Sequence, residues 1–288
     1  MEPRARLHVL SFPYESLEPL TGGREQMLIA ARSPGSALVW EVGPVLRPET
    51  LSFVEGRPGG LPLVAVLPEA AVLEEHPNIL APIQACRPHG LLPCGGAVDA
   101  RDVASVLRRP PLDLPADVTD YLRWRGIPVD PDTTRLLRRI IELSAEARTI
   151  TGISRHLYMS RRALGRRFLA RGLPVPSHWL QLSRILRLAC RLQNTAATIV
   201  SIAYESGYPD GFSLSNQMHR LIGYRPSQVR DFLGWEWIIE AWLRREAERG
   251  GLSSWAPAGR GREAATVAAT PPSLTRPGTP RRSRTPVS

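Results

Sequence analysis

The spacing of apolar residues changes character near the middle of the chain. In the first half, the apolar runs at residues 37–42 and 61–67 are typical of buried strands, and each is followed by a helix-like stretch. A third strand is expected at residues 90–94, followed by a helix over residues 99–109. Because strands and helices alternate, the pattern predicts a small parallel α/β domain over residues 36–110.

The segments on either side of this domain are rich in turn-forming residues. Residues 1–35 are predicted to be irregular, with one short helix over residues 24–31. Residues 111–131 begin and end with prolines, and we expect a linker that carries one short helical piece.

From residue 132 to residue 249 the apolar residues recur every three or four positions, which predicts an all-helical domain. Its last segment, residues 231–249, holds more large apolar groups than a free helix would, and we expect them to pack within the molecule. These groups are Trp235, Trp237, Ile238, Ile239 and Trp242. Residues 250–288 are mostly Gly, Ser, Thr, Pro, Ala and Arg, and are predicted to form a disordered tail.

Positive charge is concentrated in the helical half. All 37 basic residues of the 288-residue chain are Arg, and the net charge is +10. Residues 148–230 hold 13 Arg against two acidic residues, Glu205 and Asp210, so this block alone carries +11. Such a block favours a polyanionic partner, because Arg that neutralises phosphates releases counterions. A solvated basic surface without a partner is the alternative.

Two segments within the basic block have the pattern of a helix-turn-helix. In ITGISRHLYMSRRALGRRF, residues 150–168, Ile153 lies on the apolar face of a short helix, Ser160 caps the next helix, and Leu164 anchors it. The second segment, residues 199–222, repeats the arrangement, and Asp210 is its cap.

Residues 133–233 resemble the C-terminal DNA-binding domain of AraC/XylS-type transcription regulators, in which a long helix joins two helix-turn-helix units. The long helix is expected here at residues 177–193, long enough to set the units about one turn of DNA apart. The strongest match is GYPDGFSLSNQMHRLIGYRPSQVR, which resembles the second recognition helix and the closing pattern of that family. The closing pattern consists of Gly223, Pro226, Ser227 and Arg230.

The resemblance implies which residues contact DNA. Those of the first unit are Arg162, Gly165 and Arg166, with Arg161 near the backbone, and those of the second are Gly211, Phe212, Ser213 and Asn216. Arg suits guanine, Asn suits adenine, and Phe can touch a thymine methyl group. Gly165 has no side chain for a base contact, and Gly211 and Phe212 stand where the family often has polar residues. We therefore expect charge-assisted recognition to depend on the first unit.

The N-terminal domain is loosely similar to a response-regulator receiver domain in its order of strands and helices. No Asp follows its predicted strands at a place suited to phosphorylation, and Glu69 follows the second strand. If the domain is receiver-like, it has lost its phosphoacceptor, and a role in homodimerisation or protein docking is expected instead.

Other chemistry is weakly supported. Cys86, His89 and Cys94, with His76 upstream, lack the paired spacing of a zinc site, so no metal or cofactor is predicted and the three cysteines are expected to be free thiols. No Gly-rich phosphate loop or G-x-S-x-G elbow occurs. We predict a regulator without enzymatic activity, whose partners are duplex DNA and RNA polymerase. The alternatives are an enzyme with a DNA-targeting appendage and an interaction scaffold.

The chain is expected to be cytoplasmic. No apolar run approaches the ~20 residues of a membrane span, and the first residues lack the pattern of a secretory signal.

Overall fold

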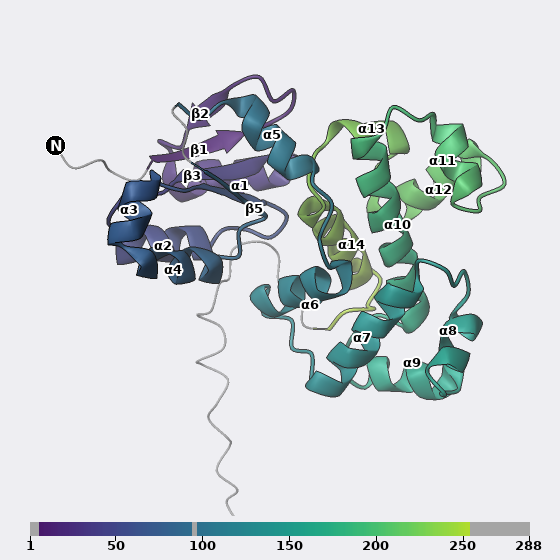
Figure 1. The fold of residues 1–288 in the computed structure, drawn as a ribbon. Helices are drawn as coiled ribbons and strands as arrows, with labels where there is room; N and C mark the ends of the chain where they lie inside the picture. Colours follow the sequence, from purple (N-terminus) through teal and green to yellow (C-terminus); the bar gives the residue numbers. More distant parts are fainter. Residues whose placement is uncertain (1–5, 94–96, 254–288) are drawn as a thin grey trace, which may run out of the picture.

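The structure is a computed structural model that describes residues 6–93 and 97–253. A sheet with helices on both faces comes first, and a helical part follows it (Figure 1). The predicted fold class, an α/β domain followed by an all-α domain, is confirmed.

The sheet has five strands in the order β2-β1-β3-β4-β5. In chain order they are β1 (Arg6–Leu10), β2 (Leu17–Pro19), β3 (Ala37–Glu41), β4 (Leu63–Val66) and β5 (Gly90–Leu92). β3, β4 and β5 are parallel neighbours, whereas β1 is antiparallel to both β2 and β3. The sheet is therefore mixed.

One expectation for this region is wrong. Residues 1–35 were predicted to be irregular apart from a short helix over residues 24–31. That helix is present as α1 (Gly23–Arg32), but β1 and β2 also lie in this segment and extend the sheet. The three strands predicted within residues 36–110 are β3, β4 and β5, and they are parallel neighbours as predicted. The sheet departs from a receiver-like one at β1 and β2, which form an antiparallel hairpin. β2 has only three residues, LEP, which is too short for an alternating apolar pattern to be recognised.

Helices cover both faces of the sheet, because successive side chains of a strand point to opposite sides. Leu38 and Trp40 of β3 pack in one apolar cluster with α1, α2 (Pro48–Glu55) and α4 (Leu80–Ala85). Val39 packs in a second cluster with α5 (Ala100–Arg108) on the other face. The short α3 (Ala70–Glu75) and the 3-10 turn Pro77–Ile79 precede α4.

The helical part is built around α10 (Pro176–Asn194), which contacts most of the other helices of this part. The others are α6 (Leu114–Trp124), α7 (Pro131–Leu143), α8 (Ile150–His156), α9 (Arg161–Leu169), α11 (Ile199–Glu205), α12 (Gly211–Ile222), α13 (Pro226–Asp231) and α14 (Glu236–Glu248). Trp242 of α14 packs against Trp179 of α10, with ring centroids 4.6 Å apart and ring planes inclined at 59°. The predicted intramolecular packing of residues 231–249 is confirmed, since all five of their large apolar groups are buried.

The predicted linker is not a free connector. Leu114, Val118 and Leu122 of α6 are buried in the same apolar cluster as α7, α10 and α14. The predicted disordered tail, residues 250–288, lies outside the described residues from position 254 onward. Before that point Leu252 is buried, and the backbone N–H of Ser253 donates to the carbonyl of Gly172 at 3.0 Å.

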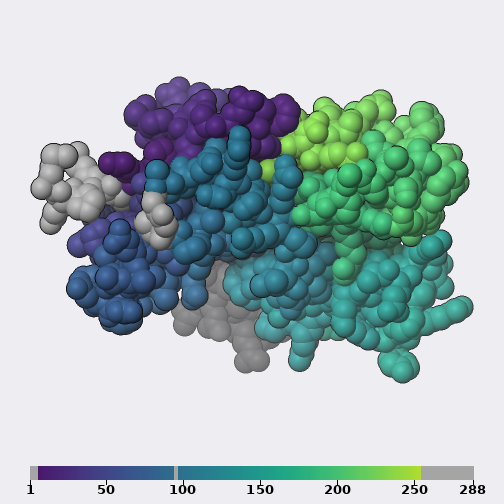
Figure 2. Space-filling view, turned by 45° about the horizontal axis from the view of Figure 1, so that its top comes forward, coloured from purple at the N-terminus to yellow at the C-terminus, as the bar shows by residue number. Residues whose placement is uncertain are grey.

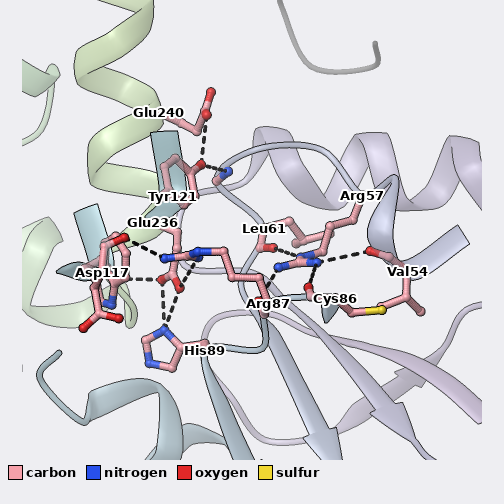
Figure 3. A network of polar contacts seen from close by, with 12 residues as sticks. Val54, Arg57, Leu61, Cys86, Arg87, His89, Asp117, Tyr121, Glu236 and Glu240 are labelled. Atoms are coloured by element: carbon pink, nitrogen blue, oxygen red, sulfur yellow. Dashed lines mark hydrogen bonds and ion pairs between the residues drawn. The ribbon is translucent and has the colours of Figure 1, made fainter. Parts of the chain in front are cut away.

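The two parts of the chain pack directly against each other (Figure 2). Arg87 and His89 of the α/β part face Glu236 at the start of α14, and Tyr121 of α6 faces Glu240 one turn later (Figure 3). The guanidinium of Arg87 also lies 4.9 Å from the ring centre of Tyr121. A buried polar network thus fixes the helical part to the sheet.

Candidate nucleic-acid interface

The first helix-turn-helix unit consists of α8 and α9. The Thr149 hydroxyl accepts the N–H of Gly152 at 3.2 Å and begins α8, and the Ser160 hydroxyl accepts the N–H of Ala163 at 3.1 Å and begins α9. The side chain of Leu164 is completely buried, and so is that of Phe168 one turn later. This anchoring leaves the opposite face of α9 toward solvent.

The second unit consists of α11 and α12 and is built in the same way. Thr198 caps α11, and the Asp210 carboxylate accepts the N–H of Ser213 at 2.6 Å to cap α12. That hydrogen bond lowers the pKa of Asp210 below its usual value. Leu214 and Met218 occupy the buried positions that Leu164 and Phe168 hold in the first unit, fifty positions earlier.

The turns of the two units also match in backbone geometry. Tyr158 and Gly207 both have positive φ, 51° and 78°, at the end of the first helix. The next residue in each unit, Met159 or Tyr208, donates its N–H to a carbonyl five positions earlier, at 3.0 and 2.9 Å. The units are therefore structural repeats, and their outward faces can be compared position by position.

The predicted contact residues of the first unit share one exposed face. Arg161, Arg162 and Arg166 are exposed on α9, and Gly165 lies between them and is partly covered. Arg167, in contrast, is turned toward α7, where it pairs with Asp132 at 3.0 Å. The structure thus places the predicted cations together and separates Arg167 from them.

The predicted residues of the second unit are divided. Phe212 and Asn216 are exposed one turn apart on α12, which puts them on the same face. Gly211 and Ser213 are partly covered, and Ser213 is engaged with the carboxylate of its cap, Asp210. Phe212 and Asn216 are therefore the residues of this set that α12 exposes to solvent.

Most Arg side chains of the basic block form intramolecular hydrogen bonds or ion pairs. Those with a hydrogen bond or ion pair are Arg167, Arg171, Arg184, Arg187, Arg191, Arg220, Arg225 and Arg230. The other five side chains make none within residues 6–93 and 97–253, and they are Arg148, Arg155, Arg161, Arg162 and Arg166. Four of these five side chains lie on α8 and α9 of the first unit, and Arg148 lies just before the N-cap of α8.

Arg148 and Arg155 were missed as candidate site residues. Both belong to the basic block, but the family pattern drew attention only to the second helix of each unit. Arg155 is exposed on α8. Arg148 lies beside the turn of the second unit, since a methyl group added at Gly207 would come within 2.4 Å of its Cζ atom. The absence of intramolecular partners is the signal that marks them, and it appears only in the structure.

Figure 1 shows that α8 and α9 lie toward one end of α10 and that α11 and α12 lie toward the other, both on the side away from the sheet. A family model described as a helix-turn-helix domain matches residues 153–231, from α8 to α13. The chain carries an AraC-type helix-turn-helix domain. The AraC-type domain makes the protein a DNA-binding transcription regulator. No curated protein matches the chain.

The remaining candidate chemistry lies away from this domain surface. His89 pairs with Glu236, and Cys86, whose pKa burial raises, has its sulfur 3.9 Å from the carbonyl of Leu51. Cys94 lies outside the described residues. Among the residues that the structure describes, no three potential metal ligands lie together. In the same part of the chain, no helix is both long and apolar enough to cross a membrane.

Proposed function

We propose that the protein binds specific sites in duplex DNA by placing α9 and α12 in successive turns of the major groove, on one face of the duplex. The length of α10 supports this arrangement. Its 19 residues span about 28 Å at 1.5 Å per residue, which is comparable to the ~34 Å of one turn of DNA.

The observation that carries the proposal is the set of free cations on α9. Arg162 and Arg166 are four positions apart and project from one face, where each can offer two donors to guanine while Arg161 meets a phosphate. The structure supplies no internal partner for them within the described residues. In a folded protein, such a cluster is stabilised when an anionic partner neutralises it.

We further propose that the protein acts by binding and not by catalysis, with RNA polymerase as a protein partner and the α/β part as a dimerisation or docking module. The cavity between the two parts supports a non-catalytic role. It measures about 380 Å³ and is lined by His89, Glu236, Arg87 and Trp235 among others, but the His89 imidazole and the Glu236 carboxylate are already paired with each other. An enzyme with a DNA-targeting appendage would need free groups converging there.

The test is DNA binding by Arg162→Ala combined with Arg166→Ala. Binding to duplexes selected from a random pool by the full chain should fall at least tenfold, because two guanine contacts are lost. The dependence of log K on log salt should also become shallower, because two positive charges leave the anionic groove. The control removes the same charge from the α/β part, by Arg32→Ala with Arg101→Ala, both exposed. Unchanged affinity and salt slope in the α9 variant would contradict the proposal.

A further inference from the structure

We propose that the second unit recognises T·A base pairs, with Phe212 and Val200 on thymine methyl groups and Asn216 on adenine. The inference rests on the proposed DNA-binding function and concerns which bases the second unit selects. It follows from comparing equivalent positions in the two repeats.

The repeats present the same outward positions with opposite chemistry. Residue 151 of α8 corresponds to 200 of α11, 155 corresponds to 204, and 162 of α9 corresponds to 212 of α12. The first unit carries Thr151, Arg155 and Arg162 at these positions, and all three are exposed. The second unit carries Val200, Tyr204 and Phe212, which are 52%, 60% and 72% exposed. An exposed apolar patch therefore stands where the first unit has two arginines and a threonine.

The patch extends over two helices that contact each other. Val200 and Tyr204 are four residues apart and share one face of α11. Val200 also lies beside the start of α12, because a methyl group added at Gly211 would be 3.4 Å from its Cγ2 atom. Phe212 follows Gly211 directly. Exposed apolar groups that gather in this way mark an interaction site more often than isolated ones do.

The position of the patch favours duplex DNA as its binding partner. Since the first unit uses these positions for the DNA-facing surface, the same positions of its repeat face the next turn of the groove. The C5 methyl of thymine is the apolar group that bases present in the major groove, and aromatic side chains contact it well. Asn216 stands one turn beyond Phe212, where its amide can form a pair of hydrogen bonds with adenine: Oδ1 accepts the N6–H and Nδ2 donates to N7.

The two half-sites should therefore differ in sequence and in the source of their affinity. The half-site under α9 is expected to contain guanine and to give most of the salt dependence. The half-site under α12 is expected to contain T·A pairs and to give affinity that changes little with salt, because apolar contacts and amide hydrogen bonds release few counterions. The operator would be asymmetric even though the two units share one geometry.

The experiment uses duplexes selected by the full chain from a random pool. Each conserved thymine is replaced in turn by deoxyuridine, which removes only the C5 methyl group, and affinity is measured for the wild type and for Phe212→Ala. We expect one or two positions in one half-site at which deoxyuridine weakens wild-type binding about threefold to tenfold, as burial of a methyl group implies. The Phe212→Ala variant should bind more weakly and should not respond to the same replacement. Ile29→Ala, which truncates a 58% exposed apolar side chain on α1, is the control.

The outcomes separate the inference from the function on which it rests. If Arg162→Ala with Arg166→Ala abolishes binding while Phe212→Ala and deoxyuridine change nothing, the second unit does not recognise thymine and the inference is overturned. That result would assign the apolar patch to a protein partner instead. If none of the variants affects DNA binding, the proposed function itself fails.

Discussion

His89 and Glu236 form a buried ion pair that joins the α/β part to the DNA-binding part. Nδ1 of His89 is 2.9 Å from both carboxylate oxygens of Glu236, and the two side chains are only 2% and 3% exposed. Burial alone would lower the pKa of His89, but the charge and hydrogen bond of Glu236 raise it above its usual value of 6.5. Burial alone would raise the pKa of Glu236, but His89 and Arg87 lower it.

These pKa shifts determine the direction in which the free energy of unfolding changes with pH. The stabilisation from His89 is complete below pH 6.5 and is lost as the pH rises through its raised pKa, whereas that from Glu236 is present above pH 4.5 and is lost as the pH falls. We expect His89→Gln to reduce the free energy of unfolding most between these two values and least in alkaline solution. Urea denaturation across this range checks it, with the exposed His76→Gln as control. A loss that does not diminish at high pH would contradict the assignment.

The hydroxyl of Tyr121 is a second joint between the parts. It accepts the N–H of Gly60 at 2.8 Å and donates to Glu240 at 2.9 Å, and all three groups are buried. Tyr121→Phe should lower the free energy of unfolding by about 1–3 kcal/mol, because a buried donor and a buried carboxylate each lose a partner. Chemical denaturation measures the loss, and Tyr204→Phe, at an exposed tyrosine, should change it little. If both variants are equally stable, the Tyr121 hydroxyl does not stabilise the contact between the two parts.

The sequence predicted the DNA-binding part better than the α/β part, and the reason lies in the kind of signal each offers. In α9 and α12 the apolar anchors, caps and turn residues lie within twenty positions of one another, so local pattern determines them. The position of β1 depends on pairing with β3, which is distant in the chain, and its RLHVL sequence alternates only weakly. The pairing of His89 with Glu236 joins residues far apart in sequence and leaves no local trace. For the same reason, the sequence could not show that Arg155 lacks a hydrogen bond or ion pair within the described residues, because that depends on which residues lie near it in the fold.

At the equivalent turns of the two repeats, we expect two substitutions to change the free energy of unfolding in opposite directions. Tyr158 adopts φ of 51°, a conformation that costs an L-residue about 1–2 kcal/mol, and its side chain is 97% exposed. Tyr158→Gly should therefore raise the free energy of unfolding by up to about 1 kcal/mol after the entropy cost of glycine. Gly207→Ala should lower it by about 1 kcal/mol, since it enters the same conformation and also displaces the Arg148 side chain. Chemical denaturation of both variants checks the prediction, and changes of the same sign would contradict it.

At Gly165, we expect an added methyl group to raise the stability of the protein and to lower its DNA affinity. It lies inside α9, and a methyl group added there would find no atom within 4 Å. Gly165→Ala should therefore stabilise the protein by about 0.5–1 kcal/mol, as alanine does in a helix interior. The same methyl group would stand between Arg162 and Arg166, where the helix backbone must approach the bases, so DNA affinity should fall. Gly152→Ala within α8 is the matched control, expected to leave affinity unchanged because its added methyl group makes only ordinary contacts, at 3.6 Å or more. If Gly165→Ala instead gains stability at full affinity, α9 does not bring this part of its backbone close to DNA, and the two arginines must reach the bases from a greater distance.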